Sequence, residues 1–90
     1  MVTVELTINH PAGLHARPAS KFVKLASSFP CNIEVIDLTK GTAPVNAKSI
    51  LGILSLGVDQ GHRIRIKAEG KDDSIAIDAL KTLTENNFGE

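Results

Sequence analysis

The sequence has no tryptophan or tyrosine, only three phenylalanines and a single cysteine among its 90 residues. One cysteine, Cys31, cannot form an internal disulfide, so we expect the chain to work in a reducing, cytoplasmic compartment. Without Tyr and Trp it lacks the usual base-stacking side chains of nucleic-acid binders. No apolar run approaches the roughly 18 residues of a transmembrane helix. The first residues also lack the basic and apolar stretches of a signal peptide.

An excess of charge of one sign is missing as well. Ten Lys and Arg residues balance ten Asp and Glu residues, which argues against a general nucleic-acid binder and against an anchor to anionic membranes. Three widely spaced histidines and one cysteine do not make a structural zinc site, and we expect no metal and no cofactor. The hydrophobic share of 42% and the length predict one globular domain, residues 1–90.

Periodicity of the apolar residues predicts a sheet. Strands are expected at residues 2–8, 33–38, 42–46 and 62–69. The alternation slips between Val35 and Ile36, which suggests a bulge or a strand buried on both sides. Pro44 confines its short strand to an edge or an end of the sheet. The polar residues that alternate with the apolar ones indicate an antiparallel sheet with one face open to water.

Three amphipathic helices are expected between these strands. The first begins close to residue 16, with His15 at or next to the N-cap, and Pro30 ends it. The second runs from Ser49 to Leu56, and the third follows Asp72-Asp73-Ser74 and ends at Asn86. The order is strand, helix, strand, strand, helix, strand, helix, which predicts a two-layer α+β domain.

The segment Gly-Leu-His-Ala-Arg-Pro-Ala-Ser at residues 13–20 contains the first candidate site. It places His15 at a helix start and Arg17 two residues later. The free N–H groups and the positive dipole end of a first turn attract anions, and Arg17 adds a planar phosphate donor. The same dipole disfavours a charged imidazole, and a neutral imidazole nitrogen is a nucleophile. These residues suggest a histidine that accepts a phosphoryl group, although a histidine at a loop–helix junction is more often a simple cap or surface residue.

The second candidate segment surrounds Ser49. A serine at a helix N-terminus is a natural cap and also a place where a phosphate is stabilised. A short surface helix cannot bury all the apolar residues that follow it, so some are expected to form an exposed patch for a partner.

The two segments together resemble the HPr family, the histidine-containing phosphocarrier proteins of the bacterial phosphoenolpyruvate:sugar phosphotransferase system. The Gly-Leu-His-Ala-Arg-Pro-Ala block at 13–19 is similar to the family's active-site motif. The Lys-Ser-Ile-Leu-Gly block at 48–52, continued by Ser-Leu-Gly at 55–57, is similar to its regulatory motif. The resemblance covers essentially the whole chain and implies an open-faced β-sandwich, βαββαβα, with a four-stranded antiparallel sheet and three helices on one face.

The resemblance also implies roles for residues. His15 would accept a phosphoryl group on Nδ1 from enzyme I and pass it to an enzyme IIA for sugar uptake, while Arg17 would orient and neutralise that group. Ser49 matches the serine that HPr kinase/phosphorylase modifies in some members, which also links such members to a catabolite-control transcription factor. The chain would be a monomeric stoichiometric carrier and not an enzyme.

Docking of these partners is expected on the first two helices. The family's use of that surface points to six residues, namely Ser20, Lys21, Lys24, Ile50, Leu51 and Leu54. The other histidines, His10 and His62, are expected to be solvated surface residues, and Cys31 a small half-buried one.

The stretch from Phe29 to Ser49 is about three residues longer than in typical members, which predicts an extended hairpin around Lys40-Gly41.

Two other functional hypotheses stay open. The Asn-Asn-Phe-Gly-Glu end is similar to the nitrogen-related HPr paralogue, a regulatory branch that uses the same histidine chemistry. An α+β module that binds a ligand or nucleic acid without phosphorylation is disfavoured by the neutral charge and the lack of stacking aromatics.

Overall fold

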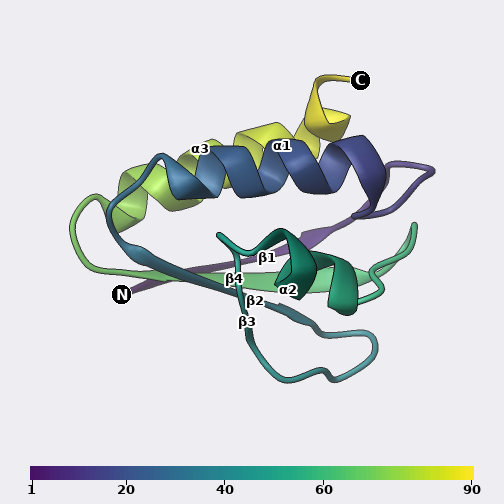
Figure 1. Cartoon of the computed structure of the whole chain (residues 1–90), viewed down its shortest axis with the longest axis horizontal. Helices are drawn as coiled ribbons and strands as arrows, with labels where there is room; N and C mark the ends of the chain where they lie inside the picture. The colour runs from purple at the N-terminus through teal and green to yellow at the C-terminus, as the bar shows by residue number, and fades with distance from the viewer.

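The strands and helices follow one another in the order expected from the sequence. A computed structural model describes all residues 1–90, and Figure 1 labels its strands and α-helices. Their bounds are β1 (Val2–Thr7), α1 (Ala16–Ser27), β2 (Asn32–Asp37), β3 (Val45–Asn46), α2 (Ile50–Ser55), β4 (Arg63–Glu69) and α3 (Asp73–Glu85), followed by a 3₁₀ turn (Asn87–Gly89).

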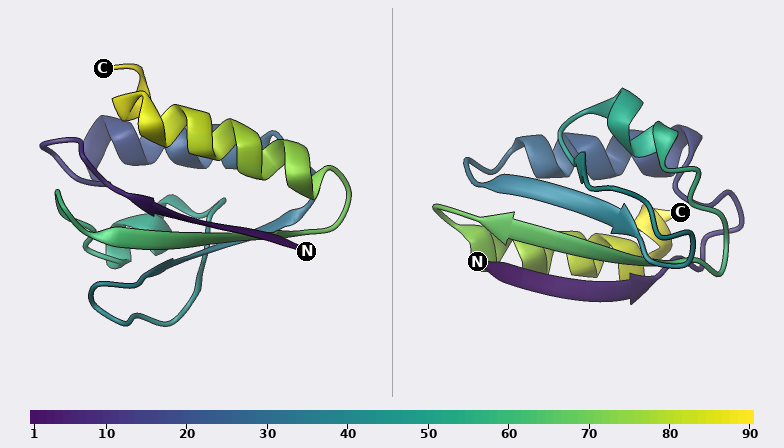
Figure 2. Two further views of the ribbon diagram at one scale, coloured as in Figure 1. Left: turned by 180° about the vertical axis from the view of Figure 1, so that it is seen from behind. Right: turned by 90° about the horizontal axis from the view of Figure 1, so that it is seen from below.

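The sheet is antiparallel throughout, with strand order β1-β4-β2-β3. Figure 2 shows α1 and α3 lying side by side across one face while the other face stays uncovered, and α2 lies next to α1 near β3. The alternation predicted for the strands matches this arrangement, because Ile64, Ile66 and Ala68 of β4 are buried while Arg63 and Arg65 are exposed. The expected open-faced β-sandwich is confirmed.

The slip of alternation in β2 has a different cause from the one predicted. Pairing with β4 is regular over Asn32–Asp37, so there is no bulge. The inward positions of the strand are Ile33, Val35 and Asp37, and all three are buried. A carboxylate occupies the inward position where an apolar residue was expected, and Ile36 points to the other face. A buried carboxylate needs a partner, and Asp37 has one in His62, described below.

The core lies between the sheet and the helices. Phe22 of α1 is fully buried, together with Ala19 and Ala26 on the same face, as the helical spacing predicts. Ala16 has the same helical spacing but is exposed, because its left-handed backbone (φ 47°) sets it off the helical face. Phe88 was read as part of the chain end, yet it is 1% exposed and lies against the core.

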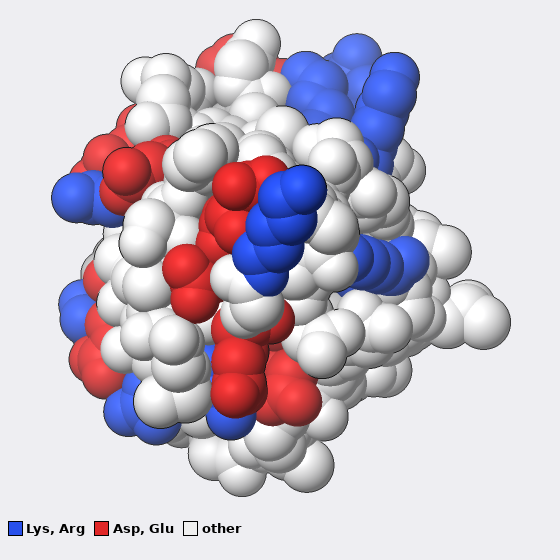
Figure 3. All heavy atoms as spheres, turned by 90° about the vertical axis from the view of Figure 1, so that its left-hand side faces the viewer, with Lys and Arg blue, Asp and Glu red and all other residues white.

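Charges of opposite sign are paired on the uncovered face of the sheet. Glu5 of β1 lies opposite Arg65 of β4, and its carboxylate is 3.0 Å from the Arg65 guanidinium. That guanidinium lowers the pKa of Glu5, with a smaller contribution from Arg63. The end of the molecule drawn in Figure 3 also carries acidic and basic side chains close to one another. That end therefore presents no field of one sign.

Candidate functional site

The start of α1 lies at one end of the molecule, beside two other segments. The loop before α1, the loop between α2 and β4 and the C-terminus all lie toward this end in Figure 1. His15 is the N-cap residue, with an extended backbone (φ −126°, ψ 170°) and no side-chain capping hydrogen bond. Pro18 is in the first turn, where its missing N–H costs nothing. The predicted helix start and cap are confirmed.

Ala16, directly after His15, has a left-handed backbone with φ 47°. L-residues with a Cβ rarely adopt this conformation, and it costs on the order of 1–3 kcal/mol unless the surroundings impose it. Here the chain before Ala16 is held, because the N–H of Leu14, two residues earlier, donates to the Val58 carbonyl at 2.9 Å. Because of this turn at Ala16, the His15 side chain does not continue the buried face of α1 but lies at the N-terminal end of the helix.

The two nitrogens of the His15 imidazole have different surroundings. Its Nε2 is 3.4 Å from Oδ1 of Asp59, and its side chain is 38% exposed. Nδ1 makes no hydrogen bond within the chain. A half-exposed imidazole with an unoccupied nitrogen at a helix N-terminus is placed to meet a group from outside the protein.

Arg17 projects from the same first turn and is 84% exposed. Its Nε is 3.4 Å from the Glu90 carboxylate, which also contacts Lys21 (3.2 Å) and His10 (3.0 Å). Lys21 donates a further hydrogen bond to the Phe88 carbonyl at 2.9 Å. These contacts fasten the end of the chain over the start of α1, a juxtaposition that no local sequence signal indicated.

This cluster makes stability depend on pH. The Lys21 ammonium, and after it His10 and Arg17, hold the pKa of Glu90 below its usual value of 4.5. A lowered folded-state pKa stabilises the protein above pH 4.5 and ceases to do so as the pH falls through the folded value. We therefore expect wild type to melt slightly above Glu90→Gln at pH 7 and the two midpoints to converge in acid, once Glu90 is protonated in the folded protein. A difference that persists unchanged in acid would assign it to packing instead.

The other two histidines are not the solvated surface residues that were expected. His10 is only 13% exposed; its Nδ1 accepts the Ala12 N–H at 3.0 Å, so its Nε2 carries the proton that it donates to Glu90. His62 is 21% exposed, and its Nδ1 lies 2.8 Å from the fully buried Asp37 carboxylate. Both histidines are drawn inward by acidic partners distant in sequence. Cys31, expected to be half-buried, is fully buried.

Ser49 is the N-cap of α2, as predicted, and its Oγ accepts the Gly52 N–H at 3.1 Å. The apolar residues after it divide between core and surface. Ile53 is fully buried, whereas Leu51 is 77% exposed and Ile50 and Leu54 are each 38% exposed. The expected exposed apolar patch is therefore present beside Ser49.

The six residues expected to dock partners lie on two helices that pack against each other. Ser20 and Lys24 of α1 are exposed, while Lys21 is half-buried in its contacts with the chain end. The other three residues, Ile50, Leu51 and Leu54, are exposed on α2.

The hairpin between β2 and β3 runs through residues 38–44. Asp37 holds its turn, because it accepts the Lys40 N–H on Oδ1. Lys40 reaches across to α2 and donates to the Leu56 carbonyl at 2.9 Å. The hairpin is thus tied to the end of the helix that carries the apolar patch.

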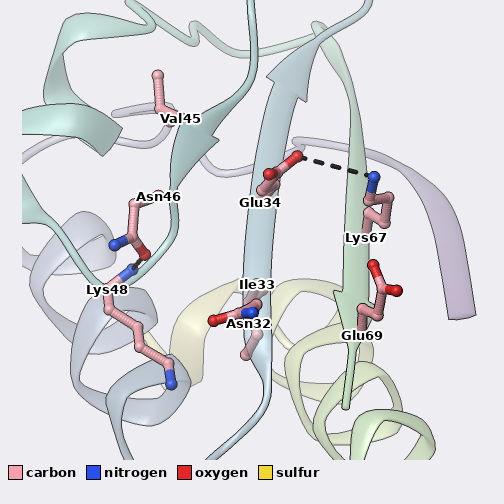
Figure 4. Close-up of a pocket in the computed structure, with 8 residues that line it drawn as sticks. All are labelled: Asn32, Ile33, Glu34, Val45, Asn46, Lys48, Lys67 and Glu69. Atoms are coloured by element: carbon pink, nitrogen blue, oxygen red, sulfur yellow. Dashed lines mark hydrogen bonds and ion pairs between the residues drawn. The ribbon is translucent and has the colours of Figure 1, made fainter. Parts of the chain in front are cut away.

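A shallow pocket of about 290 Å³ lies elsewhere, on the uncovered face between β2, β3 and β4. Figure 4 shows its polar lining, in which Lys67 faces Glu34 and Lys48 extends beside Asn46. None of the expected site residues lines it. The chain has no group of His, Cys, Asp and Glu placed to hold a metal ion, and none of its helices has the length and apolarity needed to cross a membrane.

Comparisons with known proteins show which family the chain belongs to. A family model described as "PTS HPr component phosphorylation site" matches residues 2–86. The Phosphocarrier protein HPr of Xylella fastidiosa strain Temecula1 is 43% identical over 90 residues, covering 100% of this chain and 98% of that protein. The crystal structure of HPr-C-His from Thermoanaerobacter tengcongensis is 50% identical with a TM-score of 0.94, covering 100% of this chain and 98% of that one.

A longer relative shows the same domain in another context. The Multiphosphoryl transfer protein of Haemophilus influenzae is 43% identical over 84 residues, which are 93% of this chain and 17% of that protein. The fold and these matches define a phosphocarrier and not an enzyme. The chain belongs to the HPr family of the phosphotransferase system.

Proposed function

We propose that His15 takes a phosphoryl group from enzyme I and hands it to an enzyme IIA, in the cytoplasm and in the service of sugar uptake. The observation that carries this proposal is the half-exposed imidazole at the N-terminus of α1, with its Nδ1 free and Arg17 two residues away. The family membership supports the donor and acceptor classes.

The surroundings of His15 suit a phosphoryl group better than a bare cation. The first-turn N–H groups and the dipole of α1 favour the negative charge that arrives on Nδ1. Arg17 is exposed and bound only to Glu90 at 3.4 Å, so it is free to exchange a weak surface ion pair for a phosphoryl oxygen.

The direct test is phosphorylation in a defined mixture. The chain is incubated with phosphoenolpyruvate and enzyme I, and its mass is measured before and after exposure to acid and to base. A gain of one phosphate that is lost in acid and kept in base marks a phosphohistidine. No gain, under conditions in which an authentic HPr is phosphorylated, would refute the proposal.

Arg17→Ala is expected to slow transfer without abolishing acceptance. A charge-assisted hydrogen bond to a phosphoryl oxygen contributes roughly 1.5–3 kcal/mol, and the high exposure of Arg17 places it at the lower end, so we expect a rate about tenfold lower. Arg17→Lys should recover only part, because lysine lacks the planar fork. Stopped-flow transfer to enzyme IIA measures this; a wild-type rate for Arg17→Ala would remove the residue from the reaction.

The docking surface proposed for both partners combines Ser20, Lys21 and Lys24 of α1 with the apolar patch of α2. Exposed Ile50, Leu51 and Leu54 supply desolvated contacts, and the lysines suit an acidic partner. We infer that residues 1–90 act as a single HPr domain and as a monomer, so that one small face serves donor and acceptor in turn. Short-lived shuttle contacts of this kind bury about 1,200 Å² or less.

Ser49 is the proposed regulatory site, with HPr kinase/phosphorylase as its modifying enzyme and a catabolite-control transcription factor as a further partner. The supporting geometry is its place at the N-cap of α2 directly beside the exposed apolar patch. Nothing in the site favours the nitrogen-related branch of the family over the carrier role, and the identity of the enzyme IIA partner distinguishes them.

Ser49→Asp is expected to weaken enzyme I binding while keeping α2 capped. A carboxylate at the N-cap still accepts the Gly52 N–H, but it adds charge next to Leu51 and its apolar neighbours. We expect a dissociation constant about threefold to tenfold higher at low salt, and a larger increase for the phosphoserine form with its charge near −2. Calorimetric titration with enzyme I checks this. If Ser49→Ala alone loses binding, the serine is a direct contact and not a switch.

A further inference from the structure

A carboxylate outside both sequence motifs faces the phosphoryl-accepting histidine. Asp59 lies in the loop between α2 and β4, and its Oδ1 is 3.4 Å from Nε2 of His15. Its side chain is 72% exposed and forms no hydrogen bond elsewhere in the chain. His15 is thus the one group that the Asp59 carboxylate approaches.

The backbone that carries Asp59 is fixed against the segment that carries His15. The Leu14 N–H donates to Val58 at 2.9 Å, the Gly61 N–H donates to Ile8 at 2.7 Å, and the Ile8 N–H donates to His62 at 2.9 Å. These three bonds join residues 44 to 54 positions apart in the chain and bracket Asp59 on both sides.

His62 holds the far end of the same loop. Its Nδ1 donates to the buried Asp37 carboxylate at 2.8 Å, which anchors the loop to the last residue of β2. The Gln60 amide donates to the Asn9 carbonyl at 3.1 Å on the other side. The position of the Asp59 backbone is therefore determined, and only its carboxylate is free to rotate.

We propose that Asp59 is a positioning residue for His15: its carboxylate holds the Nε2–H of the imidazole, so that the lone pair of Nδ1 is presented to the phosphoryl donor. This inference rests on the proposed function, since it concerns the same histidine. A 3.4 Å separation is long for an N–H···O bond. Hydrogen bonds of this kind tighten when charge develops, and a rotation of the exposed Asp59 side chain is enough to close this one.

The charge balance of the transfer explains why a carboxylate beside Nε2 favours phosphorylation of His15. The lone pair of Nδ1 forms the new N–P bond, while the bond between phosphorus and the donor atom of phosphorylated enzyme I breaks and leaves its electron pair on that atom. The proton on Nε2 stays in place, so the His15 ring gains positive charge. The Asp59 carboxylate neutralises that charge on the side of the ring away from phosphorus, which favours the phosphorylated state over its loss.

The experiment compares wild type with Asp59→Ala, Asp59→Glu and Asp78→Ala. Asp78 is an exposed residue of α3, so the last variant removes the same charge away from the site. Three quantities are measured: the imidazole tautomer of His15 by ¹⁵N NMR without partners, the rate of phosphorylation by enzyme I, and the rate of spontaneous hydrolysis of the purified phosphohistidine.

Opposite changes in two rates are the expected signature. For Asp59→Ala we expect phosphorylation about threefold to fivefold slower and hydrolysis faster by a similar factor, the size of an exposed ion pair, with a smaller Nε2–H tautomer population. Asp59→Glu should recover part of each, and Asp78→Ala should match wild type. A role in docking alone would leave hydrolysis and tautomer unchanged, and that result overturns the inference.

Failure of the proposed function has a different outcome. If wild type takes no phosphate from enzyme I, the carrier role is wrong, and the tautomer measurement alone decides whether Asp59 holds Nε2–H. If wild type is phosphorylated while Asp59→Ala equals Asp78→Ala in all three quantities, the carrier role stands and Asp59 has no part in it.

Discussion

His15→Ala is expected to abolish phosphoryl acceptance and to leave the fold intact. The imidazole is half-exposed, makes no capping hydrogen bond and lies outside the core, so its removal should change the free energy of unfolding by no more than about 0.5 kcal/mol. The loss of acceptance should be complete, because no other side chain of the site offers a free imidazole nitrogen. Mass spectrometry after incubation with phosphoenolpyruvate and enzyme I, with thermal melting in parallel, checks both parts.

The remaining histidines provide matched controls. Both nitrogens of His10 are occupied, one by the Ala12 N–H and one by Glu90, and His62 is committed to Asp37. His10→Ala should therefore still accept phosphate. His62→Ala should accept it too, at a temperature where the variant is folded. Because this substitution leaves Oδ2 of the buried Asp37 carboxylate without a partner, we expect it to cost roughly 1–3 kcal/mol. Phosphate found on His10 or His62 in the His15→Ala protein would contradict the assignment.

The strands were predictable because one face of the sheet is covered and the other is not. That asymmetry imposes a period of two on β1 and β4, which the sequence shows directly. The β2 strand follows the same rule, yet its period was obscured at Asp37, where a polar residue takes an inward position. His62, from outside the strand, provides the partner that makes a buried carboxylate tolerable there. The two residues are 25 positions apart, so no local sequence pattern indicates their contact.

The site was predictable where it depends on local chemistry. His15, Arg17 and Ser49 are marked by their places at helix starts, since caps and first turns follow from short spacings. Asp59 and Glu90 were not expected beside His15 and Arg17. Asp59 is 44 positions from His15, and Glu90 is 73 positions from Arg17, so only tertiary packing brings each pair together. An acidic residue in a glycine-flanked loop or near a chain end gives no sequence signal of such a contact. The burial of Phe88 was missed as well, because it depends on a left-handed backbone (φ 58°), which a phenylalanine rarely adopts, and on packing against the core.

Gly13→Ala is expected to be the most destabilising single-residue change near the site. Gly13 has φ +65°, a conformation that favours glycine, and a Cβ placed on it would lie 2.3 Å from the Val58 carbonyl oxygen and 2.9 Å from the Cα of Asp59. Both neighbours are backbone atoms, held by the Leu14 hydrogen bond to Val58, so no side chain can rotate to make room. The loops that carry His15 and Asp59 would have to separate.

Gly41→Ala measures how much of the expected destabilisation comes from the left-handed backbone alone. Gly41 has a similar φ of +71°, but a Cβ there would meet nothing within 4 Å. A left-handed L-residue costs about 1–2 kcal/mol, so Gly41→Ala should lower the midpoint of thermal unfolding by about 4–15 °C in a chain of this size. Gly13→Ala adds an unrelieved backbone clash and should lose about 3 kcal/mol or more, a fall of at least about 12 °C. Because the separated loops also misplace His15, its rate of phosphorylation at a temperature where the variant is folded should fall as well, while Gly41→Ala keeps the wild-type rate. Equal midpoints for the two variants would mean that the loops part at no cost, and the tight approach of Gly13 to Val58 would then not be what holds the site together.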